Sequence, residues 1–129
     1  MIKNINIRGI FTLKGLYYIS TLIIAILVGF VSGTVDILHT APVLEASKHL
    51  GYPLYFFSLL GVFKILGGII LLLPRFFNKY KSAAYWGFAF DFIFASFSHY
   101  SVGDDTTKIA APLVFLLFLA ISYFLKDRV

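Results

Sequence analysis

Two apolar runs joined by a short basic loop decide the fold: Leu54–Leu73 is LYFFSLLGVFKILGGIILLL, and Ser82–Tyr100 is SAAYWGFAFDFIFASFSHY. Each run carries one charged residue near its middle, Lys64 in the first and Asp91 in the second. Lys64 lies ten residues before the proline that follows its run, and Asp91 lies ten residues after the lysine that precedes its own. At about 1.5 Å per helical residue, both charges would lie about 15 Å from the loop, near the midplane of a bilayer core about 30 Å thick.

A lone charge at that depth costs about 2.5–3.5 kcal/mol on insertion scales, so each charge is expected to have a buried partner. The sequence therefore predicts that Lys64 and Asp91 pair, directly or through one water, on facing sides of two helices. Two interpretations stay open. The pair is either a neutralised contact that fixes helix packing, or a proton relay or binding site for a polar ligand headgroup.

Two further apolar runs, Leu16–Val35 and Ile109–Leu125, have the same length of roughly 17–20 residues, which suits one helical crossing each. The runs are continuous rather than alternating, which favours helices over strands. We predict an all-α, polytopic membrane protein: one four-transmembrane-helix bundle over residues 1–129. The first run is too long for the core of a signal peptide, so we expect it to be retained as a helix. A short surface-lying helix is expected over Ala41–Leu50.

Composition agrees with a membrane protein. Of the 129 residues, 60% are hydrophobic and 13% charged, against about 25% charged in soluble domains. No cysteine is present, which excludes disulfides, thiol catalysis and cysteine-ligated metal sites. The net charge of +5 comes from basic residues at the ends of the apolar runs. We therefore interpret the charge as a topology signal, with no nucleic acid partner expected.

The basic residues set the orientation, because lysine and arginine accumulate in cytoplasmic loops. In a four-crossing model, one side holds only Lys48 and Lys108, beside several acidic residues. We expect the cytoplasmic (inner) membrane, with both termini cytoplasmic. The opposite, cytoplasmic side holds eight basic residues: Lys3, Arg8, Lys14, Arg75, Lys79, Lys81, Lys126 and Arg128.

Small residues form a stripe on each of the first three predicted helices, and small residues let helices approach closely in membranes. The stripes predict that these helices converge on a small polar centre, with the fourth helix as lipid-facing cover. The centre either only packs the bundle or also holds a ligand. The stripes are Thr21, Ala25, Gly29, Ser32 and Asp36; Gly61, Lys64 and Gly68; and Ala84, Gly87, Asp91, Ala95 and Ser98.

Lys64, Asp91, His99 and Asp36 are the candidate intramembrane polar site. His99 and Asp36 fall near the outer ends of their helices, with His39 close to Asp36. A proton-exchange or metal site there would require three segments to meet, and the spacing matches no strong metal signature. An interfacial hydrogen-bonding histidine is the simpler interpretation. The sequence also has no phosphate-binding loop or nucleophile elbow, so no metal or other cofactor is predicted.

Several short motifs in order resemble those of the DoxX-like family of small integral membrane proteins. The likeness runs from about Gly51 to Asp104. Ser82 stands where many relatives have an acidic residue, and Asp36 has no counterpart in the motifs. The motifs are LGYP (50–53) with Tyr55, LGVFKILGG (60–68), LPR (73–75), KSAAYWGFAFD (81–91), and SHY (98–100) followed by Gly103 and Asp104.

The resemblance implies a four-helix membrane bundle. The family takes its name from a subunit of a thiosulfate:quinone oxidoreductase. We expect an accessory or small lipophilic-ligand-binding component without catalysis of its own. The alternative is a membrane oxidoreductase subunit or enzyme acting on a quinone or other lipophilic substrate, with Asp91, Lys64 and His99 handling protons. A small transporter is a third, weaker class. Expected partners are membrane lipid, a lipophilic small molecule or quinone, and a second copy or partner membrane subunit.

Overall fold

The computed structural model describes residues 2–128, with side chains from Thr12 to Arg128. Lys3 and Arg8 therefore lie outside the residues whose side chains are described. The described chain is all-helical, with short turns between elements. The elements are α1 (Ile2–Leu22), the π-helix η1 (Ile23–Ser32), α2 (Gly33–Ile37), α3 (Ala41–Leu50), α4 (Leu54–Leu71), the 3-10 turn η2 (Arg75–Phe77), α5 (Asn78–Ser101) and α6 (Thr106–Leu125).

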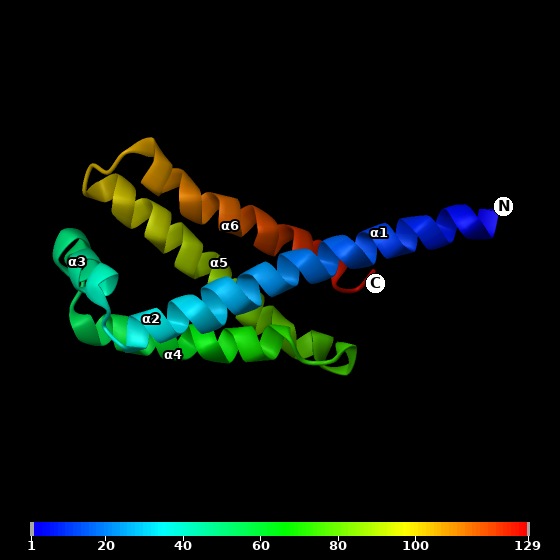
Figure 1. The fold of residues 1–129 in the computed structure, drawn as a ribbon, viewed down its shortest axis with the longest axis horizontal. Helices are drawn as coiled ribbons and strands as arrows, with labels where there is room; N and C mark the ends of the chain where they lie inside the picture. The colour runs from blue at the N-terminus through cyan, green and yellow to red at the C-terminus, as the bar shows by residue number, and fades with distance from the viewer. Residues whose placement is uncertain (1, 129) are drawn as a thin grey trace.

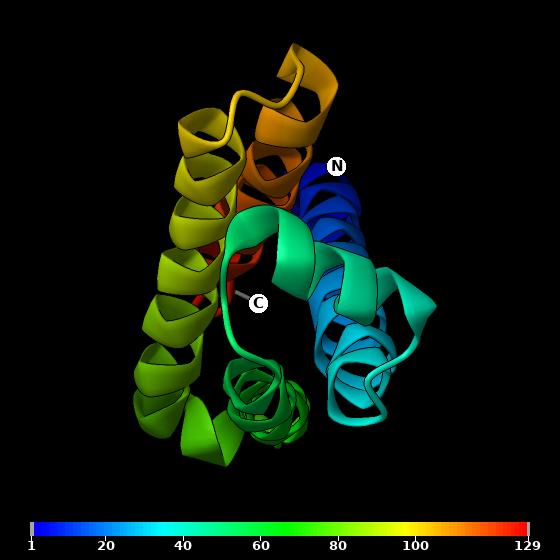
Figure 2. The same ribbon diagram turned by 90° about the vertical axis from the view of Figure 1, so that its left-hand side faces the viewer.

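The helices run between two ends of an elongated molecule (Figure 1). Helices α1, η1 and α2 follow one another as a single rod. Both termini and the α4–α5 turn lie toward one end, and α3 and the α5–α6 loop lie at the other. Seen from that second end, α3 lies across the bundle between α5 and the α1–α2 rod (Figure 2). We call the end with the termini the terminal end and the other the α3 end.

Among the residues that the structure describes, three helices are long and apolar enough to cross a membrane: Thr12–Ile37, Leu54–Leu71 and Thr106–Leu125. Together with the helical fold they support a transmembrane protein. The fourth predicted run, Ser82–Tyr100, lies inside the 24-residue α5. That helix is not among the three, since it carries polar and charged residues along its length, with Asp91 near the middle.

Turn chemistry explains where α3 and α4 begin and end. The predicted short helix Ala41–Leu50 is confirmed as α3. Gly51 follows it in the left-handed conformation, with φ of 83°, which is the usual C-terminal stop of a helix. Pro53 then precedes the first residue of α4 in an extended conformation. The LGYP motif thus reverses the chain at the α3 end and starts the next long helix.

Glycines bring α4 against the η1–α2 rod. A Cβ added to Gly61 would lie 2.5 Å from the carbonyl oxygen of Gly33, and one added to Gly29 would lie 2.9 Å from Cα of Gly68. Backbones this close leave no room for a side chain. Two of the three predicted small-residue stripes therefore pack against each other. On the third stripe, Gly87 of α5 makes no such contact, since a Cβ there would meet nothing within 4 Å, whereas Ala84 lies in the buried core with Ala25.

The apolar core lies between η1, α4, α5 and α6. Its members come from all four elements and include Ile24, Leu71, Tyr85, Phe88 and Leu119. One side of α6 carries exposed large apolar residues, as lipid-facing cover requires: Leu113, Val114, Leu117 and Phe124. The other large apolar residues of α6 are half-buried or buried, and Ser122 is fully buried.

Candidate functional site

Lys64 is held inside the molecule by polar groups from the first helical rod. Its Nζ donates hydrogen bonds to Oδ2 of Asp36 at 2.8 Å and to Oγ of Ser32 at 2.9 Å. The side chains of Lys64 and Asp36 are only 12% and 8% exposed. The contact follows from the close packing of α4 against α2. Gly61 lies one helical turn before Lys64, and a Cβ added to Gly61 would lie 3.1 Å from Cβ of Asp36. The ion pair and the close backbone approach are thus parts of one interface.

The predicted direct pairing of Lys64 with Asp91 is wrong. The carboxylate within salt-bridge distance of Lys64 is that of Asp36. The physical reason is that α4 packs backbone to backbone against η1–α2, which places Asp36 within reach of the ammonium. Helix α5 meets α4 through larger side chains, with the Phe88 ring against Gly67, so Asp91 remains farther away. Within residues 12–128, Asp91 has no side-chain hydrogen bond or ion pair.

Asp91 and Lys64 nevertheless line the same groove between α4 and α5, whose volume is about 700 Å³. They are the two charged residues in its lining, and Tyr52 adds a hydroxyl. Gly87, with open space where a Cβ would lie, widens the groove next to Asp91. The remaining lining is aromatic or aliphatic: Phe56, Leu60, Phe63, Leu66, Gly67, Ile70, Ala83, Ala84, Phe88, Phe90 and Phe94.

The rim of the groove is formed by large apolar side chains that also reach the outer surface. Phe63 of α4 and Phe94 of α5 are 60% and 63% exposed, and both line the groove. Phe88 is buried at the opposite wall, where its ring contacts Gly67. The side of the groove between α4 and α5 therefore presents an apolar surface.

Tyr52 closes the groove toward the α3 end. Its hydroxyl lies 2.6 Å from Oγ of Ser98 on α5, and its ring stacks on Phe56 with centroids 4.6 Å apart. Ser47 of α3 donates a 2.6 Å hydrogen bond to the Tyr52 carbonyl oxygen. The LGYP and SHY motifs, nearly fifty residues apart in sequence, thus meet at one end of the groove.

His99 belongs to a different cluster. Its Nδ1 lies 2.6 Å from Oδ2 of Asp104, while Nε2 of His49 lies 2.6 Å from Oδ1 of the same carboxylate. The hydrogen bond from His99, and then that from His49, lower the pKa of the Asp104 carboxyl below its usual value. This His49–Asp104–His99 cluster ties α3 to α5 and to the α5–α6 loop.

The four sequence candidates are thus divided between two places. Lys64, Asp36 and Asp91 lie at or beside the groove, and His99 lies at the α3 end with Asp104. His39 bonds Ser58 of α4 at 2.7 Å rather than joining either group. Across the described side chains, no three histidine or acidic residues are grouped so that they could hold a metal ion.

A second buried polar cluster, at the terminal end, was not anticipated from the sequence. Ser122 lies 2.6 Å from both Thr21 Oγ1 and the Tyr85 hydroxyl, joining α6 to α1 and α5. Nearby, Lys81 Nζ donates a 3.4 Å hydrogen bond to the Tyr17 hydroxyl. A lone serine in an apolar helix, and a lysine that looks like part of a loop, gave little signal. Helical phase from Asp91 would have placed Lys81 on the inner side of α5.

The model of the DoxX-like family matches residues 19–122. This range includes α4, α5 and the groove between them. It also includes all the polar residues of the clusters described above except Tyr17. No curated protein and no solved structure matches the chain. Because the family model covers well over half of the sequence, the chain belongs to the DoxX-like family.

Proposed function

We propose that this membrane protein binds a lipophilic small molecule with a polar head in the groove between α4 and α5. The observation that carries the proposal is a groove of about 700 Å³ with an almost wholly apolar lining and two charged side chains, Lys64 and Asp91. Ligand sites in proteins are usually concave, mostly apolar and about 300–1,000 Å³ in volume, with a few polar groups that orient the ligand.

The polar groups define the kind of head that would fit. The Lys64 ammonium has three hydrogens, of which Asp36 and Ser32 accept two. One N–H is therefore left for a ligand oxygen. Asp91 has no hydrogen-bonding partner among residues 12–128, so its carboxyl is available as well. A hydroxyl or carbonyl group between the two would satisfy both, and buried polar groups are costly when left unsatisfied.

Access from the side suits a ligand that dissolves in the bilayer. The proposal requires that α5 crosses the membrane together with the three more apolar helices. The chain then crosses the inner membrane four times, with both termini cytoplasmic. Support comes from the connectivity, since α4 and α6 can both span only if α5 returns the chain between their ends (Figure 1). The open groove between α4 and α5 then faces lipid.

A quinone is one ligand of this class, and the alternative function is a redox subunit or enzyme that acts on it. The observation that favours this alternative is that Lys64 and Asp91 line one groove and could handle protons at a quinone oxygen. His99 does not line the groove, so it would have no direct part in such a step.

Gly87→Leu tests the site, because a leucine there would fill space that is now open. Wild-type protein extracted in mild detergent should carry a lipophilic molecule detectable by mass spectrometry, and Gly87→Leu should lose most of it. Gly15→Leu is the matched control, since Gly15 on α1 also has open space around it and lies outside the groove lining. Equal ligand content in all three proteins, or none in wild type, would refute the proposal. A quinone in the extract would favour the redox alternative.

A further inference from the structure

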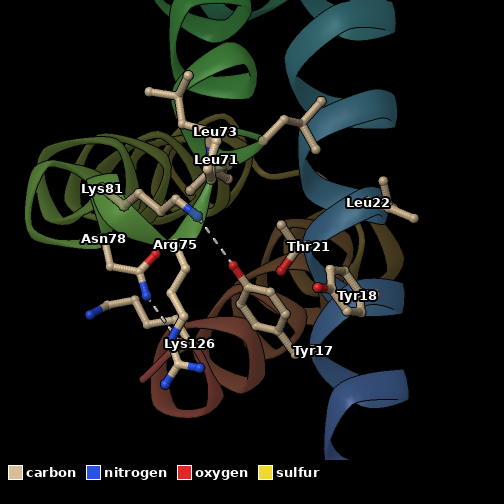
Figure 3. Close-up of a pocket in the computed structure, with 12 residues that line it drawn as sticks. Tyr17, Tyr18, Thr21, Leu22, Leu71, Leu73, Arg75, Asn78, Lys81 and Lys126 are labelled. Carbon is tan, nitrogen blue, oxygen red and sulfur yellow. Dashed lines mark hydrogen bonds between the residues drawn. The ribbon is translucent and has the colours of Figure 1, made fainter. Parts of the chain in front are cut away.

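A second cavity lies at the terminal end, shares no lining residue with the groove, and has a different chemical character. Its volume is about 210 Å³, and it is walled by α1, the α4–α5 turn, the start of α5 and the end of α6. Figure 3 shows side chains from these four segments converging on it. Three of the twelve lining residues are basic, Arg75, Lys81 and Lys126, and none is acidic.

Among these three residues, Lys81 is a buried cation without a carboxylate partner in the described part of the chain. Its side chain extends from α5 toward Tyr17 of α1 (Figure 3) and is almost entirely buried, with 2% exposure. The hydrogen bond that it makes is a long one, 3.4 Å to the neutral Tyr17 hydroxyl. No carboxylate between residues 12 and 128 forms an ion pair with it. A buried ammonium normally requires an opposite charge, and this one points into a cavity that could hold it.

Unlike Lys81, two other polar groups around the cavity are a paired lysine and an uncharged amide. Lys126 pairs with Asp127 at 2.6 Å, so its charge is partly compensated. The Asn78 side-chain nitrogen donates to the Lys126 carbonyl oxygen at 3.1 Å, while its Oδ1 is buried without a hydrogen-bond partner in the described structure. The cavity therefore offers a buried cation together with an unused acceptor, which suits an anion that also carries a hydroxyl group.

The opposite wall is apolar. Leu22 and Leu72 line the cavity and are also exposed on the outside of the helices, while Leu71 closes the interior and is 1% exposed. A ligand with its charge at Lys81 could extend an acyl chain past Leu22 and Leu72 along the lipid-facing surface. A soluble anion would make no use of this wall.

We propose that this terminal-end cavity binds the phosphate group of an anionic phospholipid, with Lys81 as the main ligand. Phosphatidylglycerol has the required features: a phosphate, free hydroxyl groups and acyl chains. Free phosphate shares the charged group but not the chains, so the two sources can be distinguished. The site is separate from the α4–α5 groove, and its test does not depend on what the groove binds.

The first test uses the unmodified, purified full chain in detergent. It measures the Tm with and without added lipid. Phosphatidylglycerol should raise the Tm of wild type more than phosphatidylcholine at the same concentration, because a ligand that binds the folded state stabilises it. Equal effects of the two lipids would overturn the proposal without any variant. If inorganic phosphate reproduces the whole effect, the phosphate site stands and the lipid source is refuted.

Variants then assign the effect to Lys81. Lys81→Met should weaken phosphatidylglycerol binding, measured by native mass spectrometry, by about tenfold or more, since it removes a charged hydrogen-bond donor to the phosphate. Lys79→Met is the matched control, because Lys79 lies in the same turn of α5, is exposed and does not line the cavity. Equal weakening by both variants would reveal general surface attraction and overturn the site.

Lys81→Arg provides a second test in case the Lys81→Met protein does not fold. It keeps the positive charge and should retain most of the preference for phosphatidylglycerol over phosphatidylcholine. Loss of that preference in a folded Lys81→Arg protein that is as stable as wild type without lipid would contradict a role based on charge.

Discussion

Lys64 links helix packing to the proposed ligand site. Its ammonium is shared between Asp36 and Ser32 on one side and the groove on the other. The sequence indicated correctly that this charge is placed inside the bundle. It could not identify the partner, because Asp36 and Asp91 both lie on small-residue stripes and only the three-dimensional crossing of α4 selects between them.

The Lys64–Asp36 contact predicts a rescue between two substitutions. Lys64→Met should destabilise the protein by about 3–5 kcal/mol, because it leaves the Asp36 carboxylate buried without its partner. Adding Asp36→Asn should recover much of that loss, whereas adding Asp91→Asn should recover little. Unfolding in detergent of the two single and two double variants measures the coupling. Rescue by Asp91→Asn rather than Asp36→Asn would show that the wrong carboxylate has been assigned.

Asp104 carries the pH dependence expected at the α3 end. Its pKa is lowered in the folded protein by hydrogen bonds from His99 and His49. A lowered carboxyl pKa stabilises the fold above the ordinary value of 3.8, and that contribution is lost as the pH falls from about there toward the folded pKa. Wild-type stability should therefore decline below about pH 4, and Asp104→Asn should show a weaker decline. Identical pH profiles for both proteins would exclude this role for Asp104.

At the scale of elements, the long helices follow from apolar runs, and α3 follows from its amphipathic pattern and the turn motif after it. The π-helical winding of η1 over Ile23–Ser32 has no comparable signal, since its residues are ordinary helix-forming apolar residues. π-helical turns are rare and often lie at functional sites. Here η1 supplies Gly29 to the crossing with α4 and Ser32 to Lys64.

The crossing of α4 with η1–α2 predicts opposite effects for two glycine substitutions. Gly61→Ala would place a methyl group 2.5 Å from a backbone oxygen, which must separate the helices and should cost about 1–3 kcal/mol. Gly87→Ala meets open space and should be neutral or stabilise α5 by about 0.5–1 kcal/mol. Thermal unfolding in detergent measures both. A Gly61→Ala protein as stable as wild type would mean that the two helices are not in backbone contact.

At the scale of the whole molecule, the sequence predicted the helical class, the membrane setting and the family, because these depend on apolar length and on motifs along the chain. The distribution of the polar residues could not be predicted in the same way. The surroundings of a polar residue depend on how helices far apart in sequence pack together. This holds for the contacts of Asp36 and Ser122 and for the groove that Asp91 lines. The sequence predicts that Lys81 lies in the basic loop, whereas the structure buries it in the first turns of α5.

Both termini lie toward the same end as the α4–α5 turn (Figure 1), and the basic residues Arg75, Lys79 and Arg128 belong to that end. The α3 end instead holds Asp104 and Asp105. Since positively charged loops stay cytoplasmic, a reporter fused after Val129 should be cytoplasmic. A reporter inserted in α3 should be on the other side of the membrane. A cytoplasmic location for both would mean that α4, α5 and α6 do not all cross the membrane, which removes the four-crossing topology on which the ligand proposal depends.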